Sequence, residues 1–198
     1  MSDAEQSIVM AKCNYAAARR AASSADFSST YAFCSSGISF LPENCWTDQY
    51  NLSLRLYELA SKSALATGNI GSLDLYSEEV TRHARSFEDR LNIYFIVISS
   101  LGYASKASEA VERSRGILAQ LGEEIPRTIT HESLVQHISE TQSMIKGISE
   151  ADFLNYKRMT DKTKLRAMTF YAKMQNLAIM VDINMSKSFL HNHLFFMW

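Results

Sequence analysis

Apolar residues recur along most of the chain at intervals of three and four, which is the periodicity of amphipathic helices. Short breakers rich in Gly, Pro, Asp or Ser separate these stretches. The stripe formed by Ala107, Ala110, Ile117 and Leu121 is the most regular. The pattern predicts helices over residues 2–25, 28–40, 48–67, 72–85, 86–101, 107–121, 130–146 and 163–183, with a short one beginning at residue 149.

Turn and capping residues set the expected helix ends. Ser28 is expected to cap one helix, and Pro42 to follow its end because proline cannot donate the next backbone hydrogen bond. Gly68 has the position of a left-handed residue after a helix. Ser86 begins a capping-box pattern, in which a hydroxyl accepts a backbone amide and a carboxylate reaches back. Thr130 is expected to cap a later helix. Together these signals predict helices joined by short turns.

Three helix-turn-helix segments align on their turns, at Phe27, Ile70 and Ala107. These anchors are 43 and 37 residues apart, which fits a repeat of roughly 34 residues with insertions. Small residues at helix crossings and larger apolar residues between units favour stacking. We therefore expect an all-α fold, a right-handed tetratricopeptide-like α-solenoid of antiparallel helix pairs. It is expected to be one array over residues 1–198, with units at about 8–42, 48–86 and 88–122 and a degenerate part at 130–185.

Composition supports helices and narrows the classes of partner. The chain contains 7 Gly and 2 Pro, which are too few turn-forming residues for the many tight turns of an all-β fold. Its net charge of −1 argues against a dedicated nucleic-acid binder. Residues 151–198 hold seven basic against three acidic residues, an asymmetry found both in partner faces and in ordinary solvated helix surfaces.

Neither a secretory signal nor a membrane span is expected from the sequence. The first residues carry no basic segment followed by an apolar run. Elsewhere no stretch of about 18 apolar residues occurs. A cytoplasmic protein with reduced thiols is therefore expected.

Residues with catalytic or ligand-binding chemistry do not form a recognisable pattern. The chain contains no glycine-rich phosphate loop. His191 and His193 have no Cys or carboxylate nearby that would complete a zinc site. Cys13, Cys34 and Cys45 lack a local nucleophile motif and are interpreted as buried, inert thiols. The sequence thus predicts no catalytic residue, no metal and no cofactor.

Two segments resemble a known family more specifically. One is residues 37–46, ending in Leu-Pro-Glu-Asn-Cys-Trp, with 57–60 downstream; the other is 146–155 followed by 159–168. Both are similar to the tetratricopeptide-like central region of very large signalling proteins. In that family a serine/threonine-kinase-like domain and an AAA-type ATPase precede this region, and sensor and histidine-kinase domains follow it. The resemblance covers roughly residues 10–180 and implies a scaffold or signal-relay segment, with kinase or AAA-type ATPase domains in the same system.

Charged residues on the first helices of the repeats form the one candidate binding site. The helical register places basic residues on the side that lines the groove of such a stack, with an aromatic and an acidic residue between them. The site comprises Lys12, Tyr15, Arg19, Arg55, Glu58 and Lys62. A cationic groove of this kind suits an acidic peptide or a carboxylate terminus. The alternative is a solvated helix face that carries long side chains.

Trp46 has two interpretations as well, a partner anchor or a packing residue between helix pairs.

These features favour a non-catalytic protein-protein interaction scaffold within a signal-transduction protein. The alternative is a ligand-sensing regulatory module that controls a linked ATPase or kinase. An enzyme on an all-α scaffold is a third hypothesis, which would require perturbed carboxylates or histidines to converge in a deep pocket. The main prediction is therefore a protein that is not an enzyme.

Overall fold

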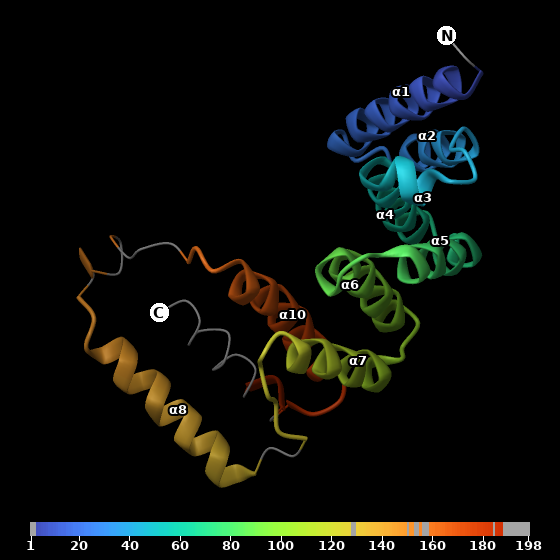
Figure 1. Ribbon diagram of the computed structural model, residues 1–198. Coiled ribbons are helices and arrows are strands. Elements are labelled where there is room, and N and C mark those ends of the chain that lie inside the picture. The colour runs from blue at the N-terminus through green and yellow to red at the C-terminus, as the bar shows by residue number, and fades with distance from the viewer. Residues whose placement is uncertain are drawn as a thin grey trace. The chain divides into compact units, whose positions relative to one another are not determined.

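The computed structural model describes residues 3–127, 130–149, 151–152, 155, 159–183 and 185–187. In these ranges the regular elements are helices and no strand occurs, so the predicted all-α fold class is confirmed. The helices are α1 (Asp3–Ser23), α2 (Phe27–Ser39), α3 (Cys45–Asp48), α4 (Tyr50–Ala66), α5 (Ile70–His83), α6 (Phe87–Tyr103), α7 (Ala107–Gln120), α8 (His131–Lys146) and α10 (Lys162–Ala178) (Figure 1).

Three helix boundaries differ from those expected. The short helix α3 was not predicted, because four residues are too few to show a period. Asp26, not Ser28, caps α2, since its carboxylate accepts the amide of Ser29 at 3.0 Å. Hydrogen bonding from the Ser29 side chain, and after it from the Ser29 amide, lowers the pKa of Asp26. Helix α10 ends at Ala178 instead of near residue 183.

Other predicted caps are confirmed by their hydrogen bonds. The hydroxyl oxygen of Thr130 accepts the amide of Ser133 at 3.1 Å, and that of Ser86 accepts the amide of Asp89 at 3.1 Å. A carboxylate oxygen of Asp89, however, accepts the hydroxyl of Tyr50 at 2.6 Å. The acidic residue of this capping box therefore ties the start of α6 to α4.

The three turns on which the sequence repeats were aligned have the same backbone conformation. Ala25, Gly68 and Ser105 all have positive φ, at 56°, 73° and 59°. The amide of the residue that follows each of them donates to the carbonyl oxygen five residues back, at 3.0, 2.8 and 2.9 Å. This is the Schellman pattern of a helix C-terminus. The spacing between these turns, 43 and 37 residues, equals the spacing deduced from the sequence.

The chain forms two compact units, residues 1–97 and 98–198, and the division in sequence falls within α6. Each unit has its own packing. In the N-terminal unit, α1 packs on α2, α2 on α4 and α4 on α5 (Figure 1). The single array expected over residues 1–198 stays a prediction.

Small residues hold the first three long helices of the N-terminal unit close together. Ala11, Ala18, Cys34 and Ala60 are fully buried around Leu56. Gly37 lies at the tightest point, where an added Cβ would meet Leu56 Cδ2 at 2.9 Å and Asn14 Cβ at 3.2 Å. A side chain at this position would therefore require Leu56 and Asn14 to shift. A second cluster joins α4 and α5 to the first half of α6 and contains Ala64, Leu73, Val80, Ala84, Ile93 and Ile96.

The core of the C-terminal unit lies between α7 and α10. Phe170, Tyr171 and Met174 of α10 are buried, as are Val111 and Leu118 of α7. Burial, with the Glu123 carboxylate near the phenol, raises the pKa of Tyr171. The hydroxyl of Tyr171 donates to Glu123 at 3.4 Å, so the segment after α7 is fastened to α10.

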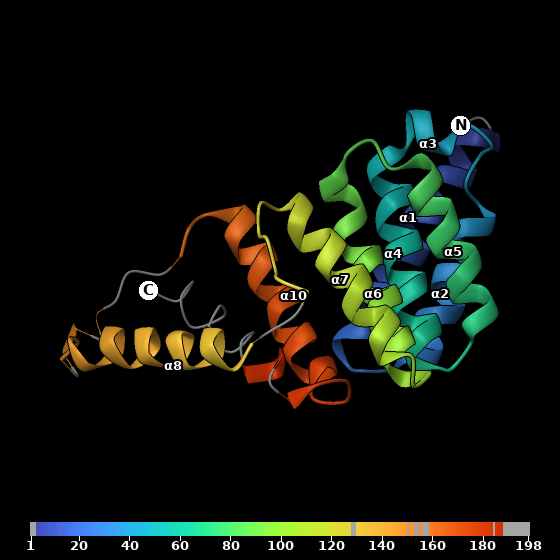
Figure 2. The ribbon, with the colours of Figure 1, turned by 90° about the horizontal axis from the view of Figure 1, so that it is seen from below.

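Helix α8 buries less of its apolar stripe than expected. Leu134 is buried as predicted, but Ile138 is 44% exposed, so its predicted burial is wrong. The reason is that none of the described helices packs extensively along that turn of α8 (Figure 2). The side chain of Ile145, also predicted to be buried, lies outside the described residues.

Candidate protein-binding surface

Helix α4 is enclosed by its neighbours on every side but one. Its exposed residues are Asn51, Arg55, Lys62 and Ala66, and Glu58 is half-buried among them. These five positions are separated by three or four residues each, so they form one narrow stripe along the helix. All other residues of α4 are buried or half-buried. The stripe therefore holds every exposed position of α4.

The predicted residues of α1 occupy equivalent positions on the first repeat. Lys12 and Arg19 are exposed and precede Arg55 and Lys62 by 43 residues, the spacing of the two left-handed turns. Tyr15, at the same offset from Glu58, is half-buried and packs against the apolar cluster of α1, α2 and α4. The guanidinium carbon of Arg19 lies 6.0 Å from the centre of the Tyr15 ring, within the range of a cation–π interaction.

The stripe continues onto α6 through a residue that sequence analysis did not select. Asn92 follows Arg55 by 37 residues, the spacing of the next pair of turns, and is exposed. Its amide donates to the Glu58 carboxylate at 2.9 Å. The repeat offset, applied once more along the sequence, is the signal that could have found it. We refer to Lys12, Tyr15, Arg19, Arg55, Glu58, Lys62 and Asn92 together as the basic stripe.

The charge of the basic stripe suits an anionic partner. Four of its seven residues are cations, and all four are exposed. Glu58 is its one acid, and the hydrogen bond from Asn92 holds one of that carboxylate's oxygens. Exposed guanidinium and ammonium groups bind carboxylates through charge-assisted hydrogen bonds, and Arg can do so with two parallel bonds. The chemistry that these side chains offer is therefore recognition of an anionic group.

Aromatic rings form a separate cluster in the N-terminal unit. The Trp46 ring stacks on His83 with centres 5.0 Å apart and an interplanar angle of 9°, and it lies 5.3 Å from the Tyr57 ring. Tyr57 meets Tyr76 edge-on at 5.7 Å. Trp46 is half-buried against the second apolar cluster, which agrees with its interpretation as a packing residue.

Arg85 locks this aromatic cluster to the turn between α5 and α6. Its guanidinium donates to the carbonyl oxygens of Trp46 and Thr47 at 3.2 Å and lies 4.0 Å from the centre of the Tyr50 ring. Its backbone amide donates to the Tyr50 hydroxyl at 2.9 Å. These bonds account for the position of α3, which has no side-chain cap of its own.

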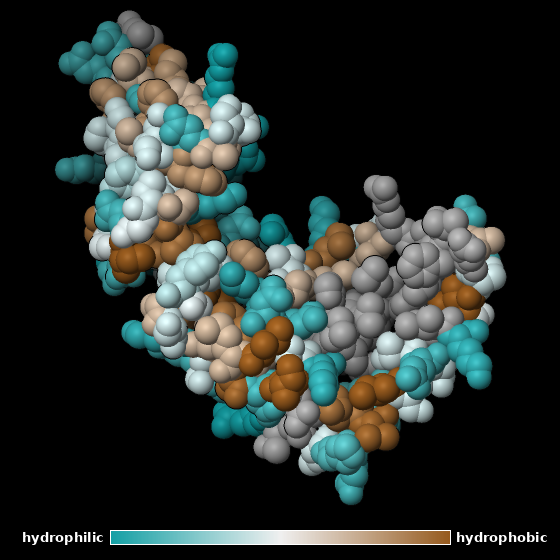
Figure 3. Space-filling view, turned by 180° about the vertical axis from the view of Figure 1, so that it is seen from behind, coloured by the Kyte–Doolittle hydropathy of each residue, from teal (hydrophilic) through white to brown (hydrophobic). Residues whose placement is uncertain are grey.

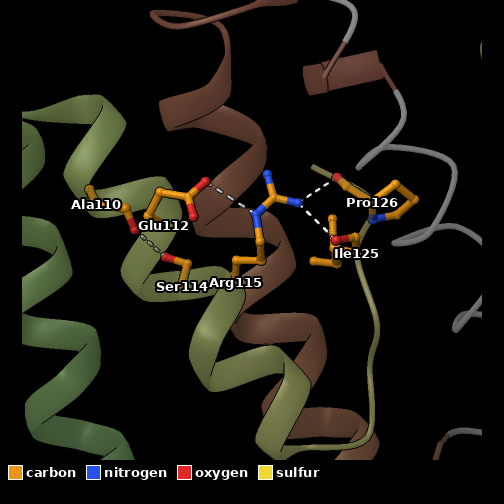
Figure 4. Close-up of polar contacts among 6 residues, drawn as sticks. All are labelled: Ala110, Glu112, Ser114, Arg115, Ile125 and Pro126. Carbon is orange, nitrogen blue, oxygen red and sulfur yellow. Dashed lines mark hydrogen bonds and ion pairs between the residues drawn. The ribbon is translucent and has the colours of Figure 1, made fainter. Parts of the chain in front are cut away.

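A buried arginine organises the C-terminal unit. Arg115 of α7 is only 8% exposed, and its Nη1 donates to the carbonyl oxygens of Ile125, at 2.8 Å, and Pro126 (Figure 4). Its Nε bonds to the Glu112 carboxylate at 3.3 Å. Arg115 thus straps the extended segment after α7 back onto the helix. Its Nη2 is buried and has no hydrogen-bond partner among the described residues.

The candidate nucleophiles and metal ligands do not form a site in the described part of the chain. Cys34 and Cys45 are buried as predicted, but Cys13 is exposed, so its predicted burial is wrong; it lies on the side of α1 that faces away from α2 and α4. Burial raises the pKa of the Cys34 thiol to about 12, which disfavours its thiolate. Among the described residues no group of three or more His, Cys, Asp or Glu is placed to hold a metal ion. His191 and His193 lie outside the described residues.

None of the described helices has the length and apolar character needed to cross a lipid bilayer. Comparison with models of protein families, with curated proteins and with solved structures finds no match to this chain.

Proposed function

We propose that this chain is a non-catalytic protein-interaction scaffold whose basic stripe binds an acidic peptide or a carboxylate terminus. The observation that carries the proposal is the exposure of α4, which is limited to one stripe containing Arg55 and Lys62. Equivalent cations, Lys12 and Arg19, stand one repeat earlier on α1. A ligand lying across both helices would meet four positive charges in succession.

The repeated turns support the architecture that this function needs. In a tetratricopeptide-like α-solenoid of antiparallel pairs, the first helix of every pair lines one continuous face. The identical left-handed turns at Ala25, Gly68 and Ser105 are what such a repeat requires locally. The signal-transduction setting, with a kinase or an AAA-type ATPase in the same system, rests on the resemblance of residues 37–46 and 146–155 to large signalling proteins.

Fluorescence anisotropy with a labelled peptide of alternating Glu and Ser, ending in a free carboxylate, tests the proposed surface. The double variant Arg55→Glu with Lys62→Glu should bind the peptide at least roughly tenfold more weakly than the unchanged protein, because the reversed charges repel the ligand. Raising the salt concentration should weaken binding to the unchanged protein. Circular dichroism should stay unchanged, since both side chains are exposed.

A matched control separates this surface from general electrostatics. Lys106→Glu with Lys146→Glu changes the net charge by the same amount at exposed positions outside the basic stripe. This variant should bind the peptide like the unchanged protein. Equal weakening in both double variants, or no binding of the acidic peptide to the unchanged protein, would contradict the proposal.

A further inference from the structure

Helix α1 presents a second surface, on the side that faces away from its own unit. In a pair of packed helices, the contact face of each helix is formed by residues spaced three, four and seven positions apart. The residues in question are Asp3, Gln6, Val9, Met10, Cys13, Ala16 and Arg20, here called the outer α1 face. All of them are exposed, and Met10 is 45% exposed although it is apolar.

The outer α1 face is apolar in its middle and charged at its ends. The middle carries Val9, Met10, Cys13 and Ala16, all of them exposed. Hydrophobic residues occur between hydrophilic ones at the N-terminal end of the N-terminal unit (Figure 3). A partner with a similar apolar middle would remove these side chains from water.

The charges at the two ends of the face identify that partner. Asp3 lies in the first turn of α1 and Arg20 in the last, a separation of about 25 Å along the axis. If two α1 helices pair in antiparallel orientation about a twofold axis, Asp3 of each copy comes opposite Arg20 of the other. The apolar middle then meets itself, with Met10 opposite the second copy's Cys13. A parallel pair would bring like charges together.

We propose that two copies of this chain associate in antiparallel orientation through the outer α1 face. The contact is isologous, so it closes at a dimer. A single pair of helices buries less than the ~1,200 Å² of a stable interface, so the dimer forms at high protein concentration. Lys12 and Arg19 of the basic stripe lie on a different side of α1, next to Tyr15, and stay open to a ligand.

Sedimentation velocity of the full chain, from micromolar to millimolar concentration, measures this association. Met10→Glu places a charge near the twofold axis twice per dimer and should weaken dimerisation roughly tenfold or more. Leu75→Glu is the matched control, because Leu75 is an exposed apolar residue of α5 in the same unit. It should dimerise like the unchanged protein.

Charge exchange tests the orientation. Asp3→Arg alone and Arg20→Asp alone should each weaken the dimer, whereas the double variant carrying both should recover it. Cys13 supplies a second measurement, since it is the exposed cysteine while Cys34 and Cys45 are buried. Its reaction with a thiol reagent should slow as the protein concentration rises.

Three results would overturn the proposal. One is a chain that stays monomeric throughout the concentration range. The second is a dimer that Met10→Glu does not weaken or that the double charge exchange does not restore. The third is assembly that continues to higher oligomers, because an isologous contact cannot propagate.

Discussion

Tyr57 lies half-buried between the rings of Trp46 and Tyr76, near the second apolar cluster of the N-terminal unit. Burial, and after it the nearby Glu79 carboxylate, raises the pKa of Tyr57 to about 12. The environment of Tyr57 thus changes its chemistry, because burial favours the neutral phenol over the phenolate. The same holds for Cys34, whose thiol is kept protonated by burial.

At the residue scale, Tyr57 predicts loss of stability in alkali. An unfolded tyrosine ionises near pH 10, and the folded Tyr57 near 12, so its contribution is complete below pH 10 and is lost as the pH rises to 12. With half of the ring near solvent, the loss is about 1 kcal/mol. Tyr57→Phe should therefore flatten the pH dependence of urea unfolding in this range.

Tyr103→Phe is the control for this measurement, because Tyr103 is 77% exposed in α6. It should leave the pH dependence of the unfolding free energy as in the unchanged protein. If Tyr57→Phe and Tyr103→Phe gave the same alkaline profile, burial of Tyr57 would not be the cause.

At the element scale, the helix-ending turns repeat along the chain while their residues do not. Gly68 occupies the left-handed position that glycine prefers, but Ala25 and Ser105 occupy the same position with side chains. A left-handed residue with a Cβ is strained by roughly 1 kcal/mol. The turns persist because each satisfies the last carbonyl groups of its helix.

Ala25→Gly and Ser105→Gly should each stabilise the protein by roughly 0.5–1 kcal/mol, because glycine removes this strain. Thermal or urea unfolding followed by circular dichroism measures the gain. Ala32→Gly, at an exposed position inside α2, is the control and should destabilise by a similar amount. Destabilisation by all three glycines would mean that the turns are not left-handed in solution.

At the scale of the whole molecule, the two compact units have separate cores. Leu56 is fully buried in the N-terminal unit, and Arg115 is buried in the C-terminal unit. Removing a side chain from one core should therefore open that unit first. Units that unfold separately violate two-state behaviour, so a method with residue resolution is needed.

Hydrogen exchange of the full chain should distinguish the two units. Arg115→Met leaves the carbonyl oxygens of Ile125 and Pro126 unpaired, costs about 1–3 kcal/mol and should speed exchange in α7 and α10. Leu56→Ala costs about 2–5 kcal/mol and should speed exchange in α1, α2 and α4. Faster exchange throughout the chain in either variant would contradict independent units.

Local chemistry made much of the fold predictable. The left-handed turn at Gly68, the caps at Ser86 and Thr130 and the helices between them depend on hydrogen bonds within a few residues, so the sequence alone indicates them. The register of the candidate site has the same origin. A repeat offset read from the turns placed Arg55 and Lys62 on one stripe, and the same offset applied further would have found Asn92.

The sequence by itself determined the helices, their short turns and the repeat offset, because hydrogen bonding and helical periodicity act over three to five residues. Only the tertiary structure decided the surroundings of several individual side chains. It buried Arg115 under the segment after α7, directed Asp89 to Tyr50 and left Ile138 exposed. These outcomes depend on contacts between residues distant in the chain, since burial is set by the surface of the neighbouring helix.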